Sequence, residues 1–156
     1  MNDDGLGDVE LAFKLGLAFQ LLLGEFTART TEAGYGDLRP IHGLAFQALG
    51  TEGATGSELA QRLGVTKQAA GQIVDHLEGR GYVERRPHPE GGRRKLVVLT
   101  TAGLEHLRTA GGILRGLEAE LGERIGATEL ADLHANLGDL IRALHEGPPP
   151  PLRPVW

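Results

Sequence analysis

Residues 55–100 read TGSELAQRLGVTKQAAGQIVDHLEGRGYVERRPHPEGGRRKLVVLT, and this stretch decides the fold. Two short helical patterns lie on either side of a tight break. Two strand-like runs follow, and a loop rich in glycine and proline joins them. This order predicts a helix-turn-helix with a small β-hairpin wing, in a chain that is otherwise mainly α-helical.

The first of these helices carries its own start and stop signals. Thr55 and Glu58 have the spacing of a capping box, in which each side chain accepts a hydrogen bond from a backbone N–H that the helix leaves unpaired. Gly64 stands where the chain must turn, and Thr66 is suited to cap the next helix. The connection is therefore three residues long, the length that a helix-turn-helix requires.

The second helix separates apolar from polar positions. Its apolar residues recur at helical spacing and are expected to point inward: Ala70, Ile73, Val74 and Leu77. The polar side is expected to face outward near the helix start, where backbone N–H groups attract phosphate. We predict that this side contacts DNA through Thr66, Lys67, Gln68, Gly71, Gln72 and His76. The competing interpretation is an ordinary solvated helix face.

The hairpin is predicted to consist of strands over residues 82–86 and 93–100, with a turn over residues 87–92. Four arginines stand at its base and tip: Arg85, Arg86, Arg93 and Arg94. We predict that they reach backbone phosphates or enter a minor groove. The alternative is a solvated hairpin whose charges only prevent pairing with another strand edge.

Positive charge is concentrated in this same stretch, although the whole chain has a formal net charge of −5. Residues 62–95 contain eight basic and four acidic residues, a net charge of +4, while the remainder has eight basic and seventeen acidic residues, a net charge of −9. A basic segment within an acidic chain indicates where a phosphate backbone could bind.

Long helices are predicted on both sides of the winged helix. Residues 6–31 show two apolar stripes at helical spacing, which either the chain itself or a second subunit must cover. Pro40 suits the first turn of a helix that ends near Gly50. A long helix is expected from Thr100 or Thr101, and another from Thr128. The last helix carries a leucine seam that predicts a dimer interface: Leu130, Leu133, Leu137, Leu140 and Leu144.

These patterns divide the chain into four segments. We expect an N-terminal dimerisation helix in residues 1–34, a winged helix-turn-helix in residues 35–100, C-terminal dimerisation helices in residues 101–146 and an extended proline-rich tail in residues 147–156. The length of 156 residues suffices for one compact domain or two lobes with a shared core.

Several classes of site find no support in the sequence. Cysteine is absent, which excludes disulfides and thiolate chemistry. His42 and His106 could approach each other, but neither belongs to a metal-ligand pattern, so we predict buried or cavity-wall histidines and no metal or cofactor. Phosphate-binding glycine loops and nucleophile motifs are missing, so no enzyme is expected.

A membrane or secreted location is also not expected. The apolar run 11–23 is short and contains Lys14 and Gln20. The N-terminus is acidic, with Asp3 and Asp4, whereas a secretory signal begins with basic residues. We therefore predict a cytoplasmic protein.

The order of elements resembles the MarR family of bacterial transcriptional regulators. The resemblance is carried by SELAQRLGVT (57–66), IVDHLEGRGYVER (73–85) and KLVVLTTAG (95–103). It implies a homodimer that binds a palindromic operator in double-stranded DNA, acts as a repressor and is released by a small-molecule effector. The alternative is a winged helix that docks another protein and binds no specific DNA.

This chain departs from the usual family pattern at three places. Gly91 and Gly92 replace the aspartate that commonly precedes the wing arginines. Gly71 and Gln72 stand where serine and arginine are common, and His76 stands where arginine is common. These differences are expected to change the preferred DNA sequence and to leave the fold unaffected.

Overall fold

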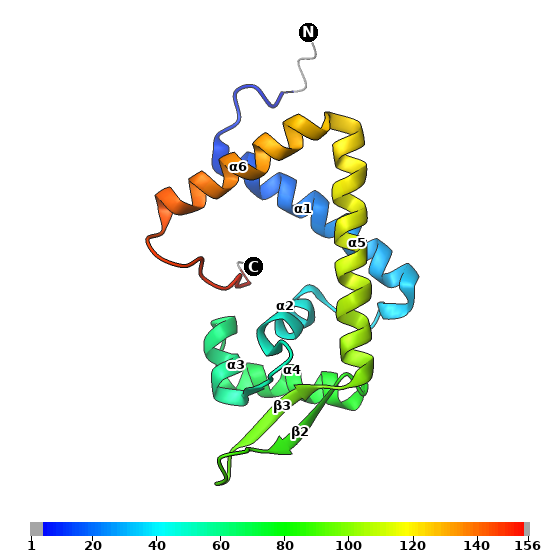
Figure 1. The fold of residues 1–156 in the computed structure, drawn as a ribbon, viewed down its shortest axis with the longest axis vertical. Helices are drawn as coiled ribbons and strands as arrows, with labels where there is room; N and C mark the ends of the chain where they lie inside the picture. Colours follow the sequence, from blue (N-terminus) through cyan, green and yellow to red (C-terminus); the bar gives the residue numbers. More distant parts are fainter. Residues whose placement is uncertain (1–4, 155–156) are drawn as a thin grey trace.

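The computed structural model describes residues 5–154; residues 1–4 of the predicted N-terminal segment and residues 155 and 156 of the predicted tail lie outside this range. Figure 1 shows a winged-helix unit at one end of the molecule and long helices that reach the opposite end. The helices are α1 (Leu11–Thr30), α2 (Pro40–Leu49), α3 (Gly56–Leu63), α4 (Lys67–Gly79), α5 (Thr101–Ile125) and α6 (Ala127–Leu144). The strands are β1 (Ala54–Thr55), β2 (Val83–Pro87) and β3 (Lys95–Leu99). The mainly α-helical fold with a small wing is confirmed.

The predicted helix signals are confirmed where α3 and α4 begin. The Thr55 hydroxyl accepts a hydrogen bond from the Glu58 amide at 3.2 Å, and Glu58 Oε2 accepts one from the Thr55 amide at 2.7 Å. Gly64 ends α3 in the left-handed conformation, with φ of 67°, which an L side chain rarely adopts. Thr66 Oγ1 accepts from the Ala69 amide at 3.1 Å and caps α4.

The core of the winged-helix unit lies among α2, α3, α4 and the sheet. Its largest fully buried side chains are Phe46, Leu49, Leu59, Leu63, Leu77, Val74 and Val83. The apolar residues predicted to point inward from α4 are all buried. Burying apolar side chains of this size stabilises the fold by roughly 1.5–3 kcal/mol each, so this core holds α3 and α4 together.

The wing belongs to a three-stranded antiparallel sheet in the order β1-β3-β2. Val83 pairs with Leu99 and Pro87 with Lys95 at the two ends of the hairpin. Strand β1 was not predicted from the sequence, because two residues are too few to show an alternating pattern. It pairs Ala54 with Val97 and joins the start of α3 to the wing.

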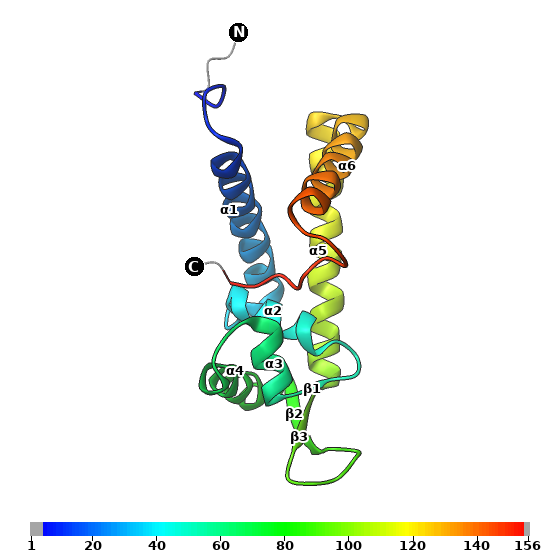
Figure 2. The same cartoon turned by 90° about the vertical axis from the view of Figure 1, so that its left-hand side faces the viewer.

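The first helix is shorter than its apolar pattern predicts. It begins at Leu11 rather than Leu6, because Glu10 has an extended backbone conformation. It continues into a π-helical turn over Thr31–Tyr35, where Gly34 takes a positive φ of 99°. Arg29 Nη1 lies 2.6 Å from Glu120 Oε1 and ties this end of α1 to α5. Figure 2 shows α1 and α5 rising together from the winged-helix unit.

Burial of α1 within its own chain is ruled out for most of its length. Phe13, Leu21 and Leu11 remain 70%, 62% and 57% exposed, and α1 has one buried residue, Thr30. None of the residues of α6 is buried. Apolar faces of this extent are unusual on a monomer. Residues 11–35 also have the length and mean hydropathy (1.3) of a membrane span, which is weak evidence on its own.

The tail lies closer to the winged-helix unit than the sequence suggests. Residues 145–154 turn back below α6, as Figure 2 shows. Arg153 Nη2 donates a hydrogen bond to the carbonyl oxygen of Gln61 at 3.0 Å. The proline-rich composition predicts an extended chain but does not reveal that it contacts α3.

Candidate nucleic-acid interface

The start of α4 presents a polar, open surface. Thr66, Lys67, Gln68 and Gln72 are exposed, and Gly71 is half-buried. A Cβ atom added to Gly71 would meet nothing within 4 Å, so the packing of this chain does not require glycine there. The structure thus places five of the six predicted residues together on the outer side, at the start of α4, the end of a helix that attracts phosphate.

His76 is the exception, and its predicted outward position is wrong. Its ring stacks on His42, with centroids 4.2 Å apart and an interplanar angle of 6°. Its Nε2 lies 3.1 Å from the carbonyl oxygen of Asp37, to which it donates in the matching tautomer. His76 follows Ile73 by three positions and precedes Leu77 by one, so it borders the apolar stripe and turns inward with it.

Asp37 is a residue that sequence reasoning missed. Besides accepting from His76, it holds Arg80 through an Nε–Oδ2 distance of 2.9 Å and accepts a longer hydrogen bond of 3.4 Å from the Tyr82 hydroxyl. It therefore fastens the end of α4 and the start of β2 to the segment before α2. Asp37 lies in an irregular break where neither helical nor strand periodicity applies, so the sequence offered no signal for it.

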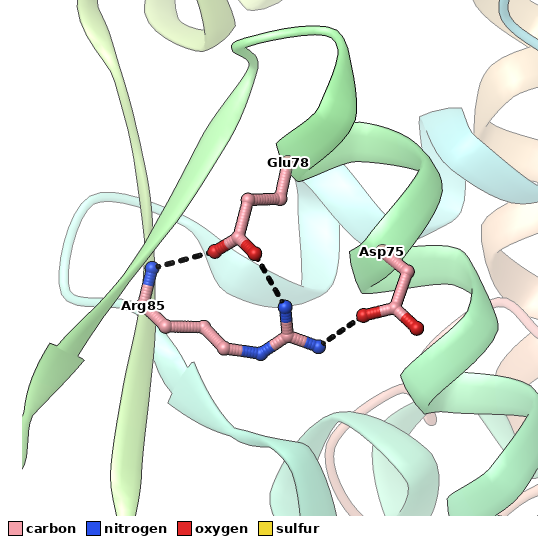
Figure 3. A network of polar contacts seen from close by, with 3 residues as sticks. All are labelled: Asp75, Glu78 and Arg85. Carbon is pink, nitrogen blue, oxygen red and sulfur yellow. Dashed lines mark hydrogen bonds and ion pairs between the residues drawn. The ribbon is translucent and has the colours of Figure 1, made fainter.

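Arg85 of the wing is held by two carboxylates of α4. Its Nη1 lies 2.7 Å from Glu78 Oε1 and its Nη2 lies 2.7 Å from Asp75 Oδ1, as Figure 3 shows. Its backbone amide donates to Glu78 Oε2 at 3.2 Å. The two carboxylates sit three residues apart on α4 and therefore share one helix face, where they attract the guanidinium.

The other wing arginines are more exposed. Arg86 pairs with Glu84 on its own strand, and its side chain is 62% exposed. Arg94 Nη2 lies 3.5 Å from Glu90 Oε2, and its side chain is 60% exposed. Arg93 forms no ion pair with any residue in the range 5–154, and the same holds for Lys67 and Lys95. Exposed ion pairs are weak, so Arg86 and Arg94 can exchange their carboxylates for phosphates.

Comparisons with known proteins agree with this geometry. Residues 37–94 match the model of the MarR family. The chain is 30% identical to the HTH-type transcriptional regulator ML2140 of Mycobacterium leprae over 146 residues, which cover 91% of this chain and 97% of that protein. The chain belongs to the MarR family.

Two solved MarR-like structures from Mycobacterium tuberculosis extend the comparison to the long helices. RV1404 is 25% identical, with a TM-score of 0.73, and the match covers 88% of this chain and 94% of that one. The MarR family protein RV2887, solved in complex with salicylic acid, is 25% identical with a TM-score of 0.66, and the match covers 86% and 98%.

This MarR chain has a large cavity above the winged-helix unit. Its volume is about 980 Å³, and α1, α2, α3, α5, α6 and the tail contribute to its walls. Most of the lining is apolar, but it also includes charged and ionisable side chains: Arg39, Arg62, His106, Glu118 and His134. His106 is 4% exposed, and its Nδ1 has no hydrogen-bond partner within the part of the chain that the structure describes. A buried unpaired ring nitrogen is costly, so a shift of the His106 ring that brought this nitrogen to a polar partner would be stabilising.

The predicted burial of the two histidines is confirmed, although they do not lie together. His42 faces His76, whereas the His106 ring contacts Tyr35 and Phe46, with centroids 4.5 Å away in each case. Across residues 5–154, no group of three or more His, Cys, Asp or Glu side chains is arranged to hold a metal ion.

Burial and the neighbouring His76 and Arg39 lower the pKa of His42 from 6.5 to about 4. In its neutral form, His42 Nδ1 accepts a hydrogen bond from the Arg39 amide at 2.9 Å at the start of α2. Protonation of His42 removes this acceptor, so acidification opposes both the burial of the ring and the start of the helix.

We predict that the free energy of unfolding decreases as the pH is lowered from about 6.5 to about 4. In this window the unfolded chain binds a proton at His42 that the folded chain excludes, so stability is fully present above pH 6.5 and is lost by up to roughly 3 kcal/mol as the pH falls. Urea unfolding at several pH values measures this loss. His42→Gln, which keeps an acceptor for Arg39, should flatten the dependence. His145→Gln, at an exposed histidine, is the control, and an equally steep profile in His42→Gln would contradict the assignment.

Proposed function

We propose that this chain is a sequence-specific DNA-binding transcriptional regulator, and that it acts as a homodimeric repressor in the cytoplasm. The observation that carries the proposal is the exposed polar start of α4 next to an arginine-bearing wing. A helix of this kind fits a major groove, where Lys67, Gln68 and Gln72 can donate to base edges and phosphates. The wing then lies over the adjacent minor groove, within reach of Arg86, Arg93 and Arg94.

The distribution of exposed apolar side chains supports DNA rather than protein as the partner of the wing. Among the described residues, every exposed large hydrophobic side chain lies outside residues 36–100. A wing that docked a protein would be expected to expose apolar or aromatic anchors. The charged wing of this chain instead suits a polyanion.

We expect saturable binding to a duplex that the protein selects from a random-sequence library. The log affinity for that duplex should fall linearly with log salt concentration. Lys67→Gln should make this slope shallower by about 0.9, because binding without one phosphate contact releases fewer counterions from the DNA. Gln72→Ala should weaken binding of the selected duplex by roughly 1–3 kcal/mol and barely affect a scrambled duplex.

Fluorescence anisotropy titrations at several salt concentrations measure both effects. Arg124→Gln is the matched control for charge, because Arg124 is exposed in the last turn of α5, at the end of that helix away from the wing. The absence of a selected sequence, or an affinity insensitive to salt, would overturn the proposed function.

We propose that a second copy of this chain packs against the exposed apolar faces of α1 and α6 and forms a homodimer. Lipid is a poorer cover for α1 than protein, because the charged side chains of Lys14, Glu25 and Arg29 would lie within the apolar layer. A second copy would cover the predicted seam on α6, where Leu130, Leu137 and Leu140 are half-buried and Leu133 and Leu144 are exposed. A twofold arrangement also presents two α4 helices to a palindromic site.

The double substitution Leu133→Asp with Leu144→Asp is expected to shift the chain to monomers. Both side chains are exposed in the single chain, at 46% and 78%, so the monomer fold should persist while a buried charge penalises the interface. Sedimentation velocity over a concentration series measures the shift. Leu152→Asp, at a 62% exposed leucine of the tail, is the control. A double variant that still sediments as a dimer would refute the seam on α6.

A small-molecule effector is proposed to bind in the cavity beside His106. Apolar walls favour a ring or chain, and Arg39 and Arg62 favour an anionic group placed away from Glu118. The unpaired Nδ1 of His106 would gain a polar partner if the ring turned toward the ligand. Burial lowers the pKa of His106, so its ring is neutral near pH 7 and offers one donor and one acceptor.

Salicylate is the probe for this site, as RV2887 has been solved with salicylic acid. We expect it to bind the wild-type chain and to weaken DNA binding. His106→Leu should reduce salicylate affinity about tenfold, the effect of losing one buried hydrogen bond. His134→Gln is the control, since His134 also lines the cavity but its side chain is 59% exposed. Isothermal titration calorimetry that detects no difference between the two variants would remove His106 from the site.

A further inference from the structure

We propose that Arg85 is a positioning residue that fixes the angle between the recognition helix α4 and the wing, and that it does not contact DNA. The inference rests on the proposed DNA-binding function. It concerns how α4 and the wing, which are proposed to approach different grooves of the DNA, are held at a fixed distance and angle to each other.

Three contacts join Arg85 to α4. Its guanidinium spans two carboxylates, with both Nη–O distances at 2.7 Å, so its plane is fixed by Asp75 on one side and Glu78 on the other. The Glu78 carboxylate also accepts from the Arg85 backbone amide at 3.2 Å. Figure 3 shows that side chain and main chain of one β2 residue are thereby tied to the same helix.

Exposure distinguishes Arg85 from the other arginines of the wing. Its side chain is 31% exposed, about half the exposure of Arg86 and Arg94. Arg86 pairs with Glu84 on its own strand, and Arg94 pairs with Glu90 in the turn of the hairpin. The Arg85 pairs are the ones that join the wing to α4.

The bridge also neutralises carboxylates on a helix that must approach phosphates. Asp75 and Glu78 are 70% and 41% exposed and would repel the DNA backbone if left unpaired. Because exposed ion pairs contribute little to folding stability, removing the bridge should leave the chain folded. The effect should appear in the relative orientation of α4 and wing, and so in discrimination between DNA sequences.

The test compares two substitutions that change the net charge in opposite directions. Arg85→Gln and Glu78→Gln each break the bridge, the first making the chain more negative and the second more positive. Positioning predicts that both lower the ratio of affinity for the selected duplex to affinity for a scrambled duplex, by about fivefold, the order expected when an exposed ion-pair network is lost. The salt slope of Arg85→Gln should match that of the wild type, because no phosphate contact is removed.

Arg86→Gln is the matched control, since it removes the same charge from the adjacent residue and leaves the bridge intact. It should weaken both duplexes in parallel and keep the ratio unchanged. Arg85→Lys keeps the charge but lacks the planar fork that spans two carboxylates, so it should restore the affinity for scrambled DNA and not the ratio. Thermal unfolding of each variant confirms that it is folded.

Each outcome decides a separate question. If Arg85→Gln lowers the salt slope by about 0.9 while Glu78→Gln strengthens both duplexes with an unchanged ratio, Arg85 contacts phosphate and the proposal is overturned. If the wild-type chain selects no sequence at all, the proposed function fails, and the role of Arg85 in DNA recognition fails with it.

Discussion

Burial of the Phe46 ring is the constraint on which the arrangement of this molecule depends. Phe46 is among the largest fully buried side chains, and it projects from α2 into the place where the wing and α5 meet. Its ring lies 5.8 Å from that of Tyr82 at the base of the wing and 4.5 Å from that of His106 on α5. Edge-to-face and tilted ring contacts of this kind stabilise the fold beyond the effect of the apolar area that they bury. One side chain thus joins the winged-helix unit to the long helices.

This joint also connects the cavity with the recognition helix through few steps. His106 lines the cavity and contacts Phe46, Phe46 contacts Tyr82, and Tyr82 shares Asp37 with His76 of α4. A close-packed interior transmits a shift of one ring to its neighbours. The path is a spatial connection, and it gives an occupied cavity a physical route to the orientation of α4.

The sequence predicts those features that depend on neighbours along the chain. The capping box at Thr55, the turn at Gly64 and the apolar stripe of α4 are local signals, and the structure confirms each of them. The ion pairs of Arg85 and the stacking of His76 were not predicted, because their partners are side chains of other elements that folding brings near. Asp37 and the two-residue strand β1 give no periodic signal, so only the tertiary structure reveals them. Family resemblance supplies the order of elements, whereas these tertiary contacts belong to the particular side chains of this sequence.

The path of the tail has a practical consequence for handling the protein. Arg153 lies against Gln61 and Gly64, beside the turn that leads into α4. A histidine-rich or charged tag that followed this segment closely would start from a point near the surface proposed to meet DNA, where it could compete with nucleic acid. The start of α1 lies at the opposite end of the molecule from the wing, as Figure 1 shows, so a cleavable N-terminal tag is the better choice for purification and immobilisation.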